Sequence, residues 1–147
     1  MKSLLLFALF ASEITFASTT DVWEGSGILF NEKVEQIGSY TLVVENTKTS
    51  RQIQSYVAVS LPDGKIIKQQ CLMTESKEGT WNSKCDHGAG GGQCFGNGLC
   101  MSYEKDSKGK AYATTIIKDG NSDMRLLRTE LQDGKPVHFF REKLHKR

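Results

Sequence analysis

Alternation between apolar and polar residues along most of the chain predicts β-strands rather than helices. In the segment 52–61, "QIQSYVAVSL", Ile53, Val57 and Val59 fall on one face and Gln54 falls on the other. β-Branched and aromatic residues, which favour strands, are frequent in the same segments. We expect eight or nine strands. The candidates are "VWEGSGILF", "SYTLVVEN", "QIQSYVAVSL", "KIIKQQCLM", "TWNSKC", "LCMSYEK", "AYATTIIK", "MRLLRTELQ" and "PVHFFREKL".

The segments between these runs carry the residues of tight hairpins. "PDGK", "DGNS" and "QDGK" place a glycine directly after an aspartate, where such turns need a positive φ. The stretch 122–132, "SDMRLLRTELQ", could also form a helix, but the hairpin-type turns on both sides favour a strand. We therefore predict an all-β fold, an antiparallel up-and-down meander that closes into a barrel and so leaves no open edge. A two-sheet sandwich is the alternative.

The first 17 residues have the layout of a secretory signal peptide. Lys2 provides a positive start, the apolar run 4–11 follows, and Thr15 and Ala17 are small residues at the positions a signal peptidase recognises. The run is far shorter than the ~20 residues a membrane-spanning helix needs. We expect residues 1–17 to be removed, residues 18–147 to form a single β-barrel domain, and the protein to be secreted or periplasmic.

The charge of the chain argues against two classes of partner. The formal net charge is +2, with basic and acidic residues spread along the sequence. Nucleic acids and anionic membranes select proteins with clustered positive charge. We therefore expect no nucleic-acid partner. The short apolar run described above is the reason that we also expect no membrane span.

The segment 21–30, "DVWEGSGILF", places a tryptophan and two glycines on the first expected strand, ahead of a long meander. It resembles the opening of lipocalin-like (calycin) barrels, in which a first-strand tryptophan plugs one end. The resemblance implies that Trp23 is such a plug. It also implies that an arginine of a late strand, Arg128 or Arg141, packs on the tryptophan.

Three of the four cysteines and one histidine gather in the segment 85–100. A zinc site made of Cys85, His87, Cys94 and Cys100 would lack the paired two-residue gaps of zinc ribbons and fingers. In an exported protein, an even set of cysteines usually forms disulfides. A hairpin that turns midway between Cys71 and Cys85 would set these two face to face, and Cys94 would then pair with Cys100. The rival pairing joins Cys85 to Cys100 and Cys71 to Cys94.

The glycines of the same segment are interpreted as a loop at the rim of the barrel, with His87 a solvated residue of that loop. The chain's other two histidines, His138 and His145, lie near its end. We find no constellation of nucleophile, base and acid, so we expect neither an enzyme nor a bound cofactor or metal.

Two binding functions remain. The first is a carrier that encloses a small apolar ligand, because an eight-stranded barrel is just wide enough for one. The alternative is a barrel that binds a protein, for example an envelope or secreted hydrolase, through the segment 85–100. The residues expected to line the cavity of a carrier are Trp23, Leu42, Val44, Val57, Val59, Met73, Trp81, Met101 and Tyr103.

Overall fold

The computed structural model describes residues 18–147, and every regular element in that range is a β-strand. The predicted all-β fold is confirmed, with ten strands instead of eight or nine. The predicted signal peptide lies outside the described residues. The strands are β1 (Thr19–Asn31), β2 (Gln36–Lys48), β3 (Gln52–Ser60), β4 (Ile66–Lys77), β5 (Thr80–Cys85), β6 (Gly88–Phe95), β7 (Leu99–Lys105), β8 (Lys110–Asp119), β9 (Asp123–Gln132) and β10 (Lys135–Lys146).

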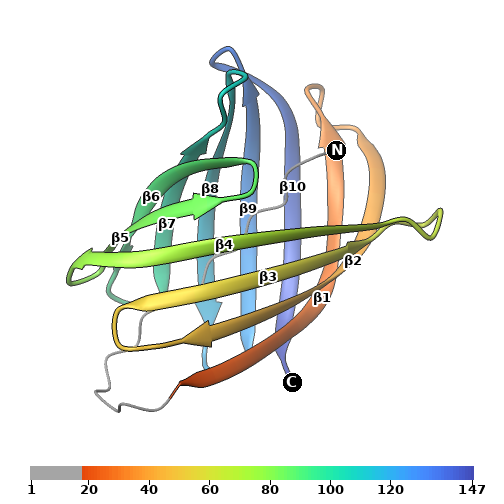
Figure 1. Ribbon diagram of the computed structural model, residues 1–147. Helices are drawn as coiled ribbons and strands as arrows, with labels where there is room; N and C mark the ends of the chain where they lie inside the picture. Colours follow the sequence, from red (N-terminus) through yellow and green to blue (C-terminus); the bar gives the residue numbers. More distant parts are fainter. Residues whose placement is uncertain (1–17) are drawn as a thin grey trace.

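The strands form one closed antiparallel barrel. Each strand pairs with the next along the chain, and β1 also pairs with β10, from Trp23 opposite Lys146 to Asn31 opposite His138. In Figure 1, β2–β4 cross in front of β8–β10 at a steep angle. The meander therefore closes as predicted, and the sandwich alternative is not formed. Closure gives both outer strands of the meander a partner and removes their open edges.

The hairpin of β4 and β5 has the register predicted from the cysteines. Cys71 lies opposite Cys85, and Met73 lies opposite Ser83. A disulfide joins Cys71 to Cys85, and a second joins Cys94 to Cys100. The predicted pairing is confirmed, and the rival pairing is wrong. Because both disulfides cross neighbouring antiparallel strands, they hold the register of β4 with β5 and of β6 with β7.

The strand that the sequence did not predict is β6, the glycine-rich segment. It was expected to be a loop at the rim of the barrel, and that expectation is wrong. β6 pairs with β5 on one side and with β7 on the other. A Cβ atom at Gly90 would lie 2.0 Å from the carbonyl oxygen of Tyr103, and one at Gly92 would lie 2.5 Å from the ring of Trp81. The backbone of β7 and the ring of Trp81 thus take the space that side chains would need. The glycines allow a tightly packed strand, not a flexible loop.

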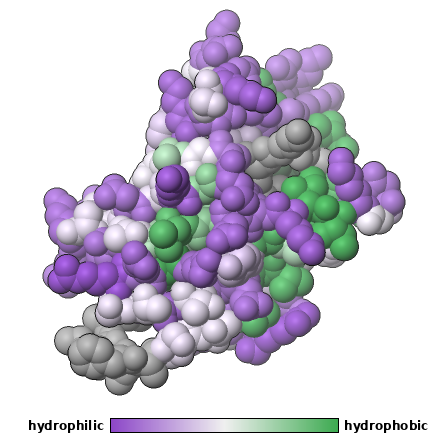
Figure 2. All heavy atoms as spheres, in the orientation of Figure 1, coloured by the Kyte–Doolittle hydropathy of each residue, from purple (hydrophilic) through white to green (hydrophobic). Residues whose placement is uncertain are grey.

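The outer surface is mixed in polarity. Figure 2 shows hydrophilic side chains over the loops at the top of the view, and hydrophobic side chains in separate patches below them. Residues 18–147 contain no helix that is long and apolar enough to cross a membrane. The exposed large hydrophobic residues are Val34, Ile37, Val43, Tyr56, Ile66, Leu72, Phe95, Met101, Tyr103 and Leu127.

A glycine-to-alanine pair tests the role of β6. Gly90→Ala should lower the free energy of unfolding by about 1–3 kcal/mol, because the new methyl group would overlap the β7 backbone. Gly96→Ala, in the turn after β6, is the control, since nothing lies within 4 Å of a Cβ atom there. Urea denaturation of both variants measures the difference. Equal stabilities would contradict the packing described for β6.

Candidate functional site

Seven of the nine residues expected to line a cavity are buried on the inner face of the barrel. They lie on β1 to β5 and belong to one hydrophobic cluster, to which β7 to β10 also contribute. Trp23 on β1 is buried and lies opposite Val44 on β2. The seven are Trp23, Leu42, Val44, Val57, Val59, Met73 and Trp81.

The prediction that Met101 and Tyr103 face the interior is wrong. Their side chains are 51% and 53% exposed, and they lie on the outside of β7. The inner face of this strand carries Cys100, Ser102 and Glu104, all buried. The apolar residues of β7 thus point to solvent and its polar residues point inward, which reverses the pattern on which the prediction depended.

The inner wall contains many polar and charged side chains in addition to the hydrophobic cluster. Burial of such groups costs free energy unless each one finds a partner. No alternation pattern distinguishes a polar inner residue from a polar outer one, so this feature was missed in the sequence. The buried polar residues are Asn46, Ser55, Gln69, Ser83, Ser102, Glu104, Thr114, Arg128, Glu130 and Glu142.

One buried network joins β2, β9 and β10. The Tyr40 hydroxyl donates to Oε1 of Glu142 at 2.6 Å, and Nη2 of Arg128 donates to the same oxygen at 2.5 Å. Burial and the neighbouring Glu142 carboxylate raise the pKa of Tyr40 far above its ordinary value. A Cβ atom at Gly27 would lie 2.2 Å from the tyrosine ring, so glycine at this position allows Tyr40 to reach the network.

The two arginines considered as partners of Trp23 lie over other aromatic rings. The guanidinium carbon of Arg128 is 4.6 Å from the centre of the Phe140 ring, and that of Arg141 is 5.7 Å from the centre of the Phe30 ring. Both contacts are in the range of cation–π interactions. Arg128 is therefore held by a carboxylate and by a ring on the same strand, β10.

A second charged group lies where β8 begins and β9 ends. Nζ of Lys110 is 2.6 Å from Oε1 of Glu130, and Nδ1 of His138 is 3.5 Å from Oε2 of the same residue. The hydrogen bond to Glu130 raises the pKa of Lys110. Glu130 is thus a buried carboxylate with a cationic partner.

A third polar group surrounds His87, in the turn between β5 and β6. Nε2 of Gln69 is within hydrogen-bond reach of Nδ1 of His87 and lies 3.3 Å from the other ring nitrogen. That nitrogen, Nε2, lies 3.5 Å from Oε2 of Glu104, and the other oxygen of Glu104 accepts a hydrogen bond of 3.0 Å from Ser83. The His87 side chain is only 12% exposed and meets the Tyr112 ring edge-on. The expectation that His87 is a solvated loop residue is therefore wrong.

The turn that carries His87 is anchored to β4. The backbone N–H of Asp86 donates to the carbonyl oxygen of Gln70 at 3.1 Å, and the Asp86 carboxylate accepts from the backbone N–H of Gln70 at 2.9 Å. These two hydrogen bonds place the next residue, His87, beside the inward-facing Gln69.

The ligand atoms of Cys85, His87 and Glu104 lie within 4.8 Å of one another, as metal ligands would. However, the sulfur of Cys85 is bonded to Cys71 and cannot act as a thiolate ligand. The zinc set considered from the sequence fails for the same reason, since none of the described cysteines is free. While the disulfides are intact, this group offers a metal only an imidazole and a carboxylate.

An arc of inward-facing polar residues runs from β2 to β7. Asn46 lies opposite Ser55, and the arc continues through Gln69 on β4 and across His87 to Glu104. In each of the five residues that we call the polar arc, one buried oxygen has no hydrogen-bond partner among the described residues. Such atoms are rare in folded proteins and need an explanation. The polar arc comprises Asn46, Ser55, Gln69, Ser102 and Glu104.

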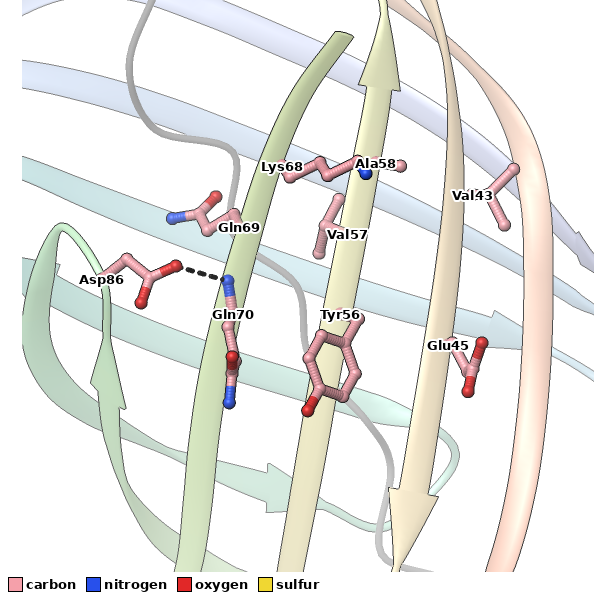
Figure 3. A pocket seen from close by; sticks show the side chains of 9 residues that line it. All are labelled: Val43, Glu45, Tyr56, Val57, Ala58, Lys68, Gln69, Gln70 and Asp86. Carbon is pink, nitrogen blue, oxygen red and sulfur yellow. Dashed lines mark hydrogen bonds between the residues drawn. The ribbon is translucent and has the colours of Figure 1, made fainter.

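A pocket of about 410 Å³ lies on the outer side of β2–β4 (Figure 3). Its lining includes outward-facing residues such as Val43, Tyr56 and Lys68. Val57 and Gln69, whose side chains are buried, complete the lining together with Asp86 from the turn after β5. Among the residues predicted to line a cavity, Val57 is the one that this pocket includes.

Comparison with known proteins informs the fold alone. No family model matches the sequence, and none of the curated proteins matches it. The structure is similar to that of the S-type phycobiliprotein lyase CPES from Guillardia theta, with a TM-score of 0.57, 11% sequence identity and 85% of each chain covered. It is also aligned with the ywiB protein from Bacillus subtilis, at a TM-score of 0.38 and 10% identity over 87% of this chain and 92% of that one. The first likeness shows a shared barrel fold and no more, and the second is too weak to carry an argument.

A tyrosine pair tests the buried network. Tyr40→Phe should lower the free energy of unfolding by about 1.5–3 kcal/mol, because it removes a hydrogen bond to a buried carboxylate. Tyr56→Phe is the control, since the exposed Tyr56 hydroxyl accepts a hydrogen bond from Gln54 at the surface, and surface changes usually stay within about 0.5 kcal/mol. Urea denaturation compares the two variants. Equal losses would mean that the Tyr40 hydroxyl does not stabilise the network.

Proposed function

We propose that this protein is an exported binding protein whose barrel encloses a small, largely apolar ligand. The observation that carries the proposal is the combination of the hydrophobic cluster, which forms an apolar wall, with the polar arc, whose buried oxygens have no partner among residues 18–147. Ligand sites typically combine an apolar lining with a few well-placed polar groups. A ligand in the interior would cover the apolar wall and supply partners for these oxygens.

The dimensions of the barrel support this function. An eight-stranded barrel can just hold a small ligand, and the interior widens as strands are added. This barrel has ten strands. Several of its inner positions carry small side chains, including Ser55, Ser83, Ser102 and Thr114, which fill less of the interior than the usual large aliphatic residues.

Binding of a protein partner through the segment 85–100 is less well supported. Most of that segment is β6 and the start of β7, which belong to the barrel wall. Two turns remain: the one around His87 is held against β4 and is partly buried, and the other spans only residues 96–98. The similar structure is named a lyase, but a likeness at 11% identity shows the fold alone, so we transfer no reaction to this chain.

Export is proposed on two grounds. The sequence of residues 1–17 has the layout of a signal peptide. The two disulfides are compatible with an oxidising compartment, where cross-links of this kind persist.

The processed protein should begin at or near Ser18. Mass spectrometry of the protein recovered outside the cytoplasm should give the mass of residues 18–147 with both disulfides formed. Recovery of an exported chain that retains residues 1–17 would contradict cleavage, and confinement of the protein to the cytoplasm would contradict export.

A pair of neighbouring valines tests where a ligand binds. Val44 is fully buried on the inner face of β2, and Val43 is 37% exposed beside the outer pocket. The protein should bind the neutral fluorescent probe Nile red saturably and with one-to-one stoichiometry. Val44→Trp should abolish this binding by filling the interior, whereas Val43→Trp should leave it unchanged.

Circular dichroism establishes that each variant is folded, and Val44→Phe replaces Val44→Trp if the larger side chain prevents folding. Loss of binding in Val43→Trp alone would place the ligand in the outer pocket. Absence of saturable binding for Nile red, fatty acids and haem would reject the carrier function.

A further inference from the structure

The polar arc offers a ligand mainly hydrogen-bond acceptors. The atoms without partners on Asn46, Gln69 and Glu104 are Oδ1, Oε1 and Oε2, which as amide and carboxylate oxygens can only accept. The hydroxyls of Ser55 and Ser102 can accept as well as donate. A ligand group that satisfies this arc must therefore carry several donors.

The buried charges of the inner wall also favour a ligand group that carries hydrogen-bond donors. Glu142 pairs with Arg128, and Glu130 pairs with Lys110. Glu104, although only 1% exposed, has no arginine or lysine partner among the described residues, and its ion-pair contact is with His87 at 3.5 Å. A buried carboxylate without a cation is costly, and a cation within hydrogen-bond distance offsets that cost.

The local packing holds Glu104 in place. A Cβ atom at Gly90 would lie 2.8 Å from Cγ of Glu104, so the glycine leaves room for this side chain. Ser83 holds one carboxylate oxygen, and Sγ of Cys85 lies 3.9 Å from that same oxygen. The second oxygen, Oε2, is the one left to bind a donor.

We propose that the ligand carries a primary amine or a similar cationic, donor-rich group, bound by Glu104 and the polar arc, with its apolar part against the hydrophobic cluster. This inference rests on the proposed carrier function and specifies the class of ligand. An ammonium group matches the arc because it carries a positive charge and three donors. An anionic head group such as a carboxylate would face repulsion from Glu104 and would bring no donors.

Three probes of equal chain length test the inference: dodecylamine, dodecanol and dodecanoate, each used below its micelle concentration. Each is titrated at pH 7 into the complex of Nile red with the complete barrel, residues 18–147, with both disulfides formed. Dodecylamine should displace Nile red at a concentration at least about tenfold lower than dodecanol, because charge-assisted hydrogen bonds are stronger than neutral ones. Dodecanoate should be the weakest of the three.

Two variants test whether Glu104 is responsible for the preference for dodecylamine. Glu104→Gln should bring dodecylamine to the affinity of dodecanol. Glu45→Gln, which removes an exposed carboxylate beside the outer pocket, should keep the amine preference. Circular dichroism checks the folding of both variants. If Glu104→Gln does not fold, Ser102→Ala should weaken dodecylamine binding without weakening dodecanol binding to the same extent.

The outcomes separate this inference from the carrier function. Failure of Nile red and of all three probes to bind would reject both. Displacement by all three probes without an amine preference, or a preference for dodecanoate, would overturn the inference and leave the carrier function standing. An amine preference that survives in Glu104→Gln and is lost in Glu45→Gln would also overturn it.

Discussion

The pairing of β1 with β10 is the contact on which the rest of the structure depends, because it closes the meander into a barrel. Closure brings the two strands close together at Gly25, where a Cβ atom would lie 1.8 Å from a carbonyl oxygen of β10. Two residues along, Gly27 makes room for Tyr40, which reaches Glu142 on β10. The two glycines of the first strand thus serve closure and the buried network together, and the interior exists only because the sheet is closed.

The closed interior combines an apolar environment with a polar one, and folding alone does not require this combination. Hydrophobic burial stabilises the barrel, whereas the polar arc and the buried carboxylates oppose folding unless they find partners. Glu142 and Glu130 find them within the described chain, in Arg128 and Lys110. The polar arc is only partly satisfied, and proteins commonly retain such groups where they bind something. The residues that weaken the core are therefore the ones on which the proposed binding function depends.

The parts of the fold that follow local rules could be predicted from the sequence. Turn glycines, alternation and the symmetric placement of Cys71 and Cys85 were enough to predict the meander and one disulfide register. β6 could not be predicted, because its glycines are required by contacts with β7 and Trp81 that form only in the folded barrel. The inner face of β7 was assigned wrongly because hydrophobic patterning assumes an apolar interior, and here Glu104 points inward while Met101 points outward. Inner-wall polarity is a property of the assembled barrel.

The methionine methyl groups allow the most direct test of an interior ligand site. Met73 and Met124 are buried inside the barrel at 0% and 1% exposure, and Met101 is 51% exposed on the outside. In an NMR titration of ¹³C-methyl-methionine-labelled protein with dodecylamine, the interior binding proposed here predicts saturable shifts of the Met73 and Met124 signals. The Met101 signal should stay unchanged. A shift of the Met101 signal while both interior signals remain fixed would contradict the account.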